Sequence, residues 1–141
     1  SATDNTTYGY NTGRFISTAS GTTAVGANAG ASISTGINNT ALGLNTLSLV
    51  TSGAGNTAVG AQSLNQLLTG AGNVAVGGAL NSATTSSNNI AIGVQSLRDL
   101  TTGSGLNVAI GHQAMLQATT ATANVIIGPQ AALSLLTEQS A

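Results

Sequence analysis

The chain has 141 residues, of which 4% are charged and 2% aromatic, and its formal net charge is -1. Ordinary domains carry about 25% charged residues. With no cysteine, no lysine and two arginines, the composition excludes a disulfide scaffold and a basic surface for nucleic acid. No apolar run approaches the roughly 20 residues that cross a membrane, so we expect no membrane insertion.

A five-residue pattern recurs eight times along the chain and ends each time in glycine. In chain order the pentamers occupy 5–9, 22–26, 39–43, 56–60, 73–77, 89–93, 107–111 and 124–128. Their glycines are 17, 17, 17, 17, 16, 18 and 17 residues apart. A short fixed period is typical of a solenoid. We therefore predict one repeat domain over 1–141, an all-β parallel β-solenoid (β-roll) of eight coils of about 17 residues.

Each pentamer is expected to form a strand, whose side chains alternate between two faces. The second residue is threonine in the first four pentamers and valine or isoleucine afterwards, and the fourth is mostly aliphatic. We predict that both point into the coil, and that buried threonine hydroxyls make the N-terminal half less stable. The predicted coil core consists of Val25, Leu42, Val59, Val76, Ile92, Ile110 and Ile127.

The other strand face carries asparagine and alanine. A flat alanine strip permits close approach of another chain, so we predict a packing strip made of Ala24, Ala41, Ala58, Ala75, Ala91 and Ala109. Stacked asparagines form amide ladders. We predict such a ladder at the turns from Asn39, Asn56, Asn73, Asn89, Asn107 and Asn124.

A second element follows each pentamer. Two residues beyond the glycine stands an amide residue in seven coils, with Ala79 the exception in the short repeat. Later coils then place apolar residues three apart, a spacing that favours a short helical turn. These pairs are Leu47 and Val50, Leu64 and Leu67, Leu97 and Leu100, Met115 and Ala118, and Ala132 and Leu135.

No residues combine into a catalytic, cofactor or metal site. The sequence GAGNTAVG from Gly53 imitates a dinucleotide-binding loop but lacks the long helix and acidic ribose partner. His112 is the only histidine and has no cysteine or acidic neighbour to share a metal. Asp4, Asp99 and Glu138 are too scattered for a carboxylate pair. We expect neither enzyme activity nor a cofactor.

The pentamers NTAVG at 56–60, NIAIG at 89–93 and NVAIG at 107–111 resemble the repeat of trimeric autotransporter adhesin heads. They also resemble the GxQ(A/S)L…TTG…NTA(V/I)G repeats of phage tail fibres. The resemblance covers Asn5 to about Leu136. It implies a left-handed parallel β-roll, three chains in one fibre, and attachment to a host or a surface.

Together these features favour a structural and adhesive fibre segment, from a phage tail fibre or a bacterial surface adhesin. Its location would be extracellular, on a cell surface or a virion. The expected partners are copies of the chain, as a trimer or head-to-tail polymer, and a host-surface receptor or glycan. The alternatives are a secreted subunit that assembles end to end into an extracellular filament, and an ice- or glycan-binding solenoid.

Overall fold

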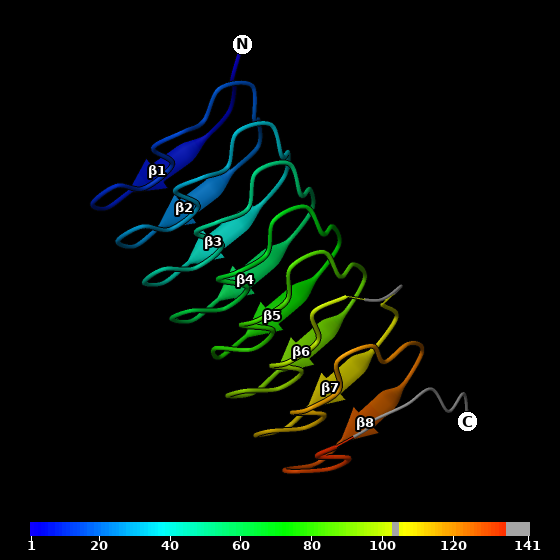
Figure 1. Ribbon diagram of the computed structural model, residues 1–141. Helices are drawn as coiled ribbons and strands as arrows, with labels where there is room; N and C mark the ends of the chain where they lie inside the picture. Colours follow the sequence, from blue (N-terminus) through cyan, green and yellow to red (C-terminus); the bar gives the residue numbers. More distant parts are fainter. Residues whose placement is uncertain (103–104, 135–141) are drawn as a thin grey trace.

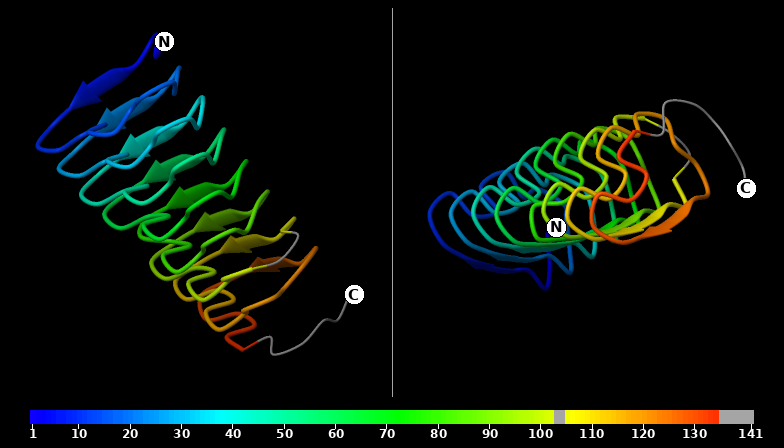
Figure 2. Two further views of the ribbon diagram at one scale, coloured as in Figure 1. Left: turned by 45° about the horizontal axis from the view of Figure 1, so that its top comes forward. Right: turned by 90° about the horizontal axis from the view of Figure 1, so that it is seen from below.

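The computed structural model describes residues 1–102 and 105–134, and it contains one sheet of eight parallel strands. In chain order the strands are β1 (Thr6–Tyr8), β2 (Thr23–Val25), β3 (Thr40–Leu42), β4 (Thr57–Val59), β5 (Val74–Val76), β6 (Ile90–Ile92), β7 (Val108–Ile110) and β8 (Val125–Ile127). They lie side by side in sequence order, and the segment between them loops behind the sheet (Figure 1 and Figure 2). The predicted parallel β-solenoid with a period of about 17 residues is confirmed.

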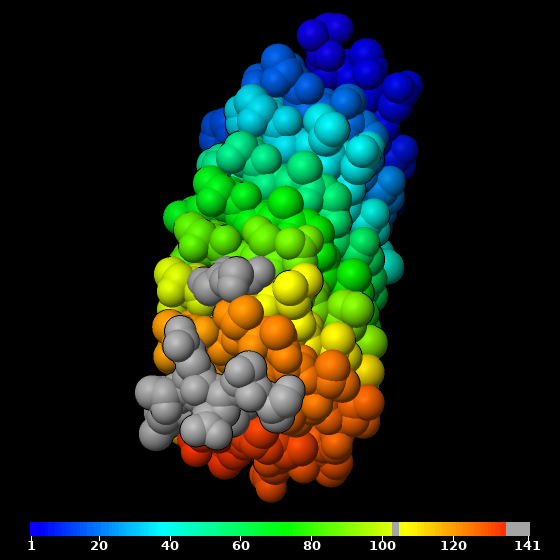
Figure 3. All heavy atoms as spheres, turned by 90° about the vertical axis from the view of Figure 1, so that its right-hand side faces the viewer, coloured from blue at the N-terminus to red at the C-terminus, as the bar shows by residue number. Residues whose placement is uncertain are grey.

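Each strand pairs in register with the next copy of its own pentamer. Thr40 lies opposite Thr57, and the register survives the uneven spacings, since Val76 pairs with Ile92 and Ile92 with Ile110. Neighbouring strands are about 4.8 Å apart, so seven steps give a stack of roughly 34 Å. Figure 3 shows the coils succeeding one another along an elongated body.

The glycine that ends the pentamer is required by the close stacking of the backbones. Gly26 has a φ of +127°, and a Cβ placed on it would lie 2.5 Å from the carbonyl oxygen of Gly43 in the next coil. A larger residue would force the coils apart at this point. The glycine period therefore marks where neighbouring coils touch.

The interior of the coils is a narrow column of small and aliphatic side chains. The middle residue of β2 to β7 is alanine, and each of these alanines is at most 1% exposed. Apolar pairs from the back of the coil join them in one cluster, for example Leu47 with Val50 and Leu97 with Leu100. The core is thus built mainly behind the sheet.

The prediction that the fourth pentamer residues form the coil core is wrong. Leu42 is 47% exposed, Ile92 38% and Ile127 68%. The other four, which are half-buried, are Val25, Val59, Val76 and Ile110. Large side chains from the back segment already fill the interior, so beneath β2 to β7 there is room only for the methyl group of alanine. The threonines at the second pentamer position, which are Thr6, Thr23, Thr40 and Thr57, also face outward, so they do not supply the buried hydroxyls that were predicted to weaken the N-terminal half.

The predicted packing strip is wrong for the same reason. Its six members point into the coil and are buried there, so they are not available to another chain: Ala24, Ala41, Ala58, Ala75, Ala91 and Ala109. Period-2 alternation identified which residues share a face of the strand. The assignment of the two faces has to be reversed.

No helical turn follows the strands in residues 1–102 and 105–134. Asn45 and Leu47 instead adopt left-handed φ angles of 54° and 49°, a region that a right-handed helix cannot contain. The three-residue spacing reflects a single turn, in which the Leu67 amide donates to the Leu64 carbonyl at 3.3 Å. Leu135, from the last predicted pair, lies outside the described residues.

The first two coils fill the interior behind the strand with other residues than the later coils do. Gly13 and Gly30 occupy the left-handed position where later coils carry leucine. A Cβ on Gly30 would lie 2.9 Å from Cδ1 of Ile33, and one on Gly13 would lie equally close to Cδ1 of Ile16. The isoleucine therefore extends over the glycine and supplies the bulk that leucine supplies elsewhere.

Candidate functional site

Asparagines at the start of the strands form a continuous inner amide ladder. Asn56 Nδ2 donates to Asn39 Oδ1 at 3.1 Å and to the Gly70 carbonyl at 2.9 Å, and its backbone N–H donates to the same Asn39 oxygen at 3.0 Å. The pattern continues coil by coil to Asn124. The ladder contains the six predicted residues: Asn39, Asn56, Asn73, Asn89, Asn107 and Asn124.

The inner amide ladder lies within the coil wall, because its first five members are fully buried. A primary amide has two donor hydrogens and can accept twice. Asn73 uses all four capacities: it donates to Asn56 and to the Ser86 carbonyl, and it accepts from the backbone and side chain of Asn89. Burying so polar a group is tolerable only because it is satisfied in this way.

Thr22 interrupts the ladder in the second coil. Its side chain is fully buried, and its hydroxyl has no hydrogen-bond partner among the residues that the structure describes. Asn5 Oδ1 on one side receives only the Thr22 backbone N–H, at 2.9 Å. A buried hydroxyl left unpaired costs about 1–3 kcal/mol.

Thr22→Asn should therefore stabilise the chain. The new amide can bond to Asn5 and Asn39 as other rungs do, and we expect the free energy of unfolding to rise by about 1–2 kcal/mol. Chemical denaturation followed by circular dichroism measures the change. The matched control is Thr23→Asn at the adjacent exposed position, which should give no gain. A Thr22→Asn chain no more stable than the parent would contradict this reading of the ladder.

The outer sheet face is defined here as the second and fourth pentamer residues of β1 to β8. Its solvent-facing side chains include Tyr8, 78% exposed, and Val125, 69% exposed. The full face consists of Thr6, Tyr8, Thr23, Val25, Thr40, Leu42, Thr57, Val59, Val74, Val76, Ile90, Ile92, Val108, Ile110, Val125 and Ile127. It carries no charge, and from β5 onward it is wholly aliphatic.

A second set of amides, the outer amide ladder, runs beyond the ends of the strands. Gln130 Nε2 donates to Gln113 Oε1 at 3.2 Å, and Gln113 Nε2 donates to Gln95 Oε1 at 2.8 Å. Asn28 and Asn45 form one further rung at 2.9 Å. The sequence pattern located these amides, but their pairing had not been predicted.

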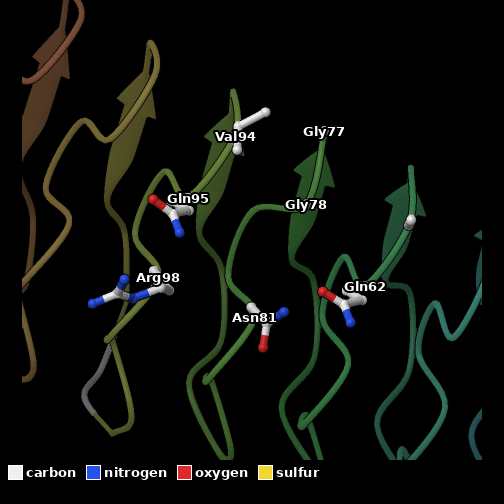
Figure 4. A pocket seen from close by; sticks show the side chains of 8 residues that line it. Gln62, Gly77, Gly78, Asn81, Val94, Gln95 and Arg98 are labelled. Atoms are coloured by element: carbon white, nitrogen blue, oxygen red, sulfur yellow. The ribbon is translucent and has the colours of Figure 1, made fainter.

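Among the described residues no hydrogen bond joins Asn45 to Gln62, and at the coil of the short repeat the outer amide ladder lacks an amide side chain altogether. Ala79 was expected at the amide position, but it is fully buried at the level of Ser63 and Ser96. The missing residue leaves Gly78 alone where the neighbouring coils carry two outward side chains. The result is a surface notch of about 440 Å³, with Gln62 and Gln95 on the two flanking coils (Figure 4).

One ion pair lies beside the notch. Arg98 Nε and Nη2 donate to the two carboxylate oxygens of Asp99 at 2.7 and 2.8 Å. This hydrogen bond raises the pKa of the Arg98 guanidinium above its ordinary value. The pair is partly exposed, so it adds little to stability, and it neutralises the cation next to the notch.

No family model, curated protein or solved structure matches the chain. Within the described ranges, no three histidine, cysteine, aspartate or glutamate side chains gather into a possible metal site. No helix in that part of the chain is long and apolar enough to cross a membrane. The outer sheet face and the notch are the two surface features of the described chain on which the proposals below rest.

Proposed function

We propose that the chain is a structural segment of an extracellular attachment fibre, and that copies of it associate through the outer sheet face. One observation carries the proposal, namely the uncharged and largely aliphatic character of that face. Parallel sheets in proteins are usually covered on both sides. Here the coil covers one side of the sheet, and nothing in the described chain covers the other.

The size of the outer sheet face is consistent with this role. Eight strands at about 4.8 Å spacing and three residues of about 3.3 Å give a strip of roughly 340 Å². The largest apolar patch on a typical monomer measures about 300–600 Å² and is often functional. A stable pair usually buries about 800 Å² on each partner, so the strip needs flanking surface as well. In a trimer around one axis, the surface on each side of the strip faces one of the two neighbouring chains and adds to the buried area.

The phage-fibre and adhesin resemblance of the pentamers supports the same trimer and an attachment role on a cell surface or virion. An end-to-end filament is the second candidate. It is favoured by the outer edges of β1 and β8, which pair with no further strand in the described part of the chain, so that each can accept another strand. A monomeric ice-binding solenoid is a third, since four stacked threonines face outward on β1 to β4.

Ile92→Lys tests the trimer. Sedimentation equilibrium should show three chains for the parent, and the lysine should weaken association at least tenfold because a charge would be buried against apolar side chains. Leu68→Lys, at an exposed leucine outside the sheet, is the matched control and should leave the trimer intact. Polymers that grow with concentration would favour the filament, and a monomer with thermal hysteresis would favour ice binding. Either result would contradict the proposal.

A further inference from the structure

The notch in the fifth coil is flanked by side-chain amides with unused hydrogen-bonding capacity. Among the described residues, the Gln62 side chain makes no hydrogen bond, and Gln95 only accepts one, from Gln113. The Nε2 hydrogens of Gln95 therefore have no acceptor in the described part of the chain, and Gly78 in the adjacent coil supplies no side chain to accept them. Within the same ranges, the side-chain amide of Asn81, which also lines the notch, makes no hydrogen bond.

The spacing of these groups defines what would fit between them. Gln62 and Gln95 belong to coils two steps apart, which corresponds to about 9.6 Å at 4.8 Å per step. One amide placed midway would stand about 4.8 Å from each, the separation at which amides of adjacent coils bond in this fold. It would accept from one glutamine and donate to the other, as a missing rung would.

We propose that the notch binds the acetamido group of an N-acetylated sugar. The sugar amide replaces the missing rung between Gln62 and Gln95. Its methyl group lies against Ala61 or Val94, which line the same notch, and ring hydroxyls reach Asn81. The volume of about 440 Å³ falls within the range of roughly 300–1,000 Å³ found for ligand pockets.

The local charge favours a neutral sugar over an anionic ligand. Arg98 is the one cation at the notch, and both of its bonded nitrogens are engaged by Asp99. The inference rests on the attachment role proposed above. A shallow site with few hydrogen bonds is weak by itself, and it becomes useful when copies of the chain present it together on one fibre.

The test is titration of the 141-residue chain with N-acetylglucosamine, followed by saturation-transfer NMR. We expect saturable binding with the strongest transfer to the acetyl methyl group, and at least tenfold weaker binding of glucose. Gly78→Gln should reduce sugar affinity at least tenfold. A Cβ there meets only the Ala61 carbonyl, at 3.2 Å, and glutamine already adopts left-handed φ at Gln62. Gln62→Ala, which removes no protein hydrogen bond, should weaken binding several-fold.

Gly55→Asn is the matched control, because a Cβ at this left-handed glycine meets nothing within 4 Å. It should bind the sugar like the parent. Absence of saturable binding, equal binding of glucose, or undiminished binding by Gly78→Gln would each overturn the inference. So would preference for N-acetylasparagine amide, which would indicate a protein side chain as the occupant. Sedimentation of the same samples separates the two proposals, because a trimer that does not bind the sugar would contradict only the proposal that the notch binds a sugar.

Discussion

Replacing Ala91 by aspartate should unfold the coils around it, whereas the same replacement at the adjacent Ile92 should leave them folded. The Ala91 side chain is 0% exposed within the core cluster, and Ile92 is 38% exposed on the outer sheet face. An aspartate at 91 would bury an unpaired charge and add volume where only a methyl group fits. We expect a loss of more than about 4 kcal/mol.

Chemical denaturation followed by circular dichroism measures both variants, at chain concentrations low enough to keep copies apart. Ile92→Asp should stay within about 1 kcal/mol of the parent as a folded chain, since an exposed strand residue tolerates a charge. Ile92→Asp should weaken the association of chains and leave the coil of each chain folded. An Ala91→Asp chain with the spectrum and stability of the parent would show that the alanine column is not the core.

The period and register of this fold could be read from the sequence, because the pentamer glycines recur where the backbones of neighbouring coils touch. Gly26 against Gly43 is the clearest example. Handedness of the coil and number of chains have no comparable signature in the residues and stay predictions.

The pentamer pattern did not show which face of each strand points into the coil. Both faces of the pentamer are apolar, with alanine on one and valine or isoleucine on the other, and larger side chains are ordinarily buried more often. What decides the matter is the back segment, where pairs such as Leu64 and Leu67 fill the coil. Those pairs resembled a helical turn, so their contribution to the core was not anticipated.

The sequence contains a signal for the notch, but not for its position within the coil. The 16-residue spacing between Gly77 and Gly93 announced a missing residue. Counting from the pentamer glycine places Ala79 at the amide position. Hydrogen bonding instead places Ala79 beside Ser63, because the Leu64 amide donates to the Ala79 carbonyl at 3.2 Å. The deletion therefore falls on the outward residues rather than on the core.

Asn89→Asp should destabilise the chain severely although it changes no heavy-atom shape. Asn89 is fully buried, and its Nδ2 donates to Asn73 Oδ1 at 3.1 Å and to the Ser87 carbonyl at 3.0 Å. A carboxylate would set an acceptor against both oxygens and bury a charge. We expect a loss of more than about 3 kcal/mol near pH 7.

The stability lost in Asn89→Asp should be larger at high pH than at low pH. Burial raises the pKa of the introduced carboxyl above its unfolded value, so the folded variant binds a proton more tightly than the unfolded chain does. The protonated form can donate one hydrogen bond, and its stability is lost as pH rises through the folded pKa. Asn88→Asp is the matched control, because this adjacent asparagine is exposed and Asp4 holds the same left-handed turn position in the first coil. Urea denaturation of both variants at pH 4 and pH 7 decides the matter. If Asn89→Asp were as stable as Asn88→Asp at both pH values, the inner amide ladder would not be a source of stability, and its hydrogen bonds would only accompany the stacking that the glycines and the alanine column enforce.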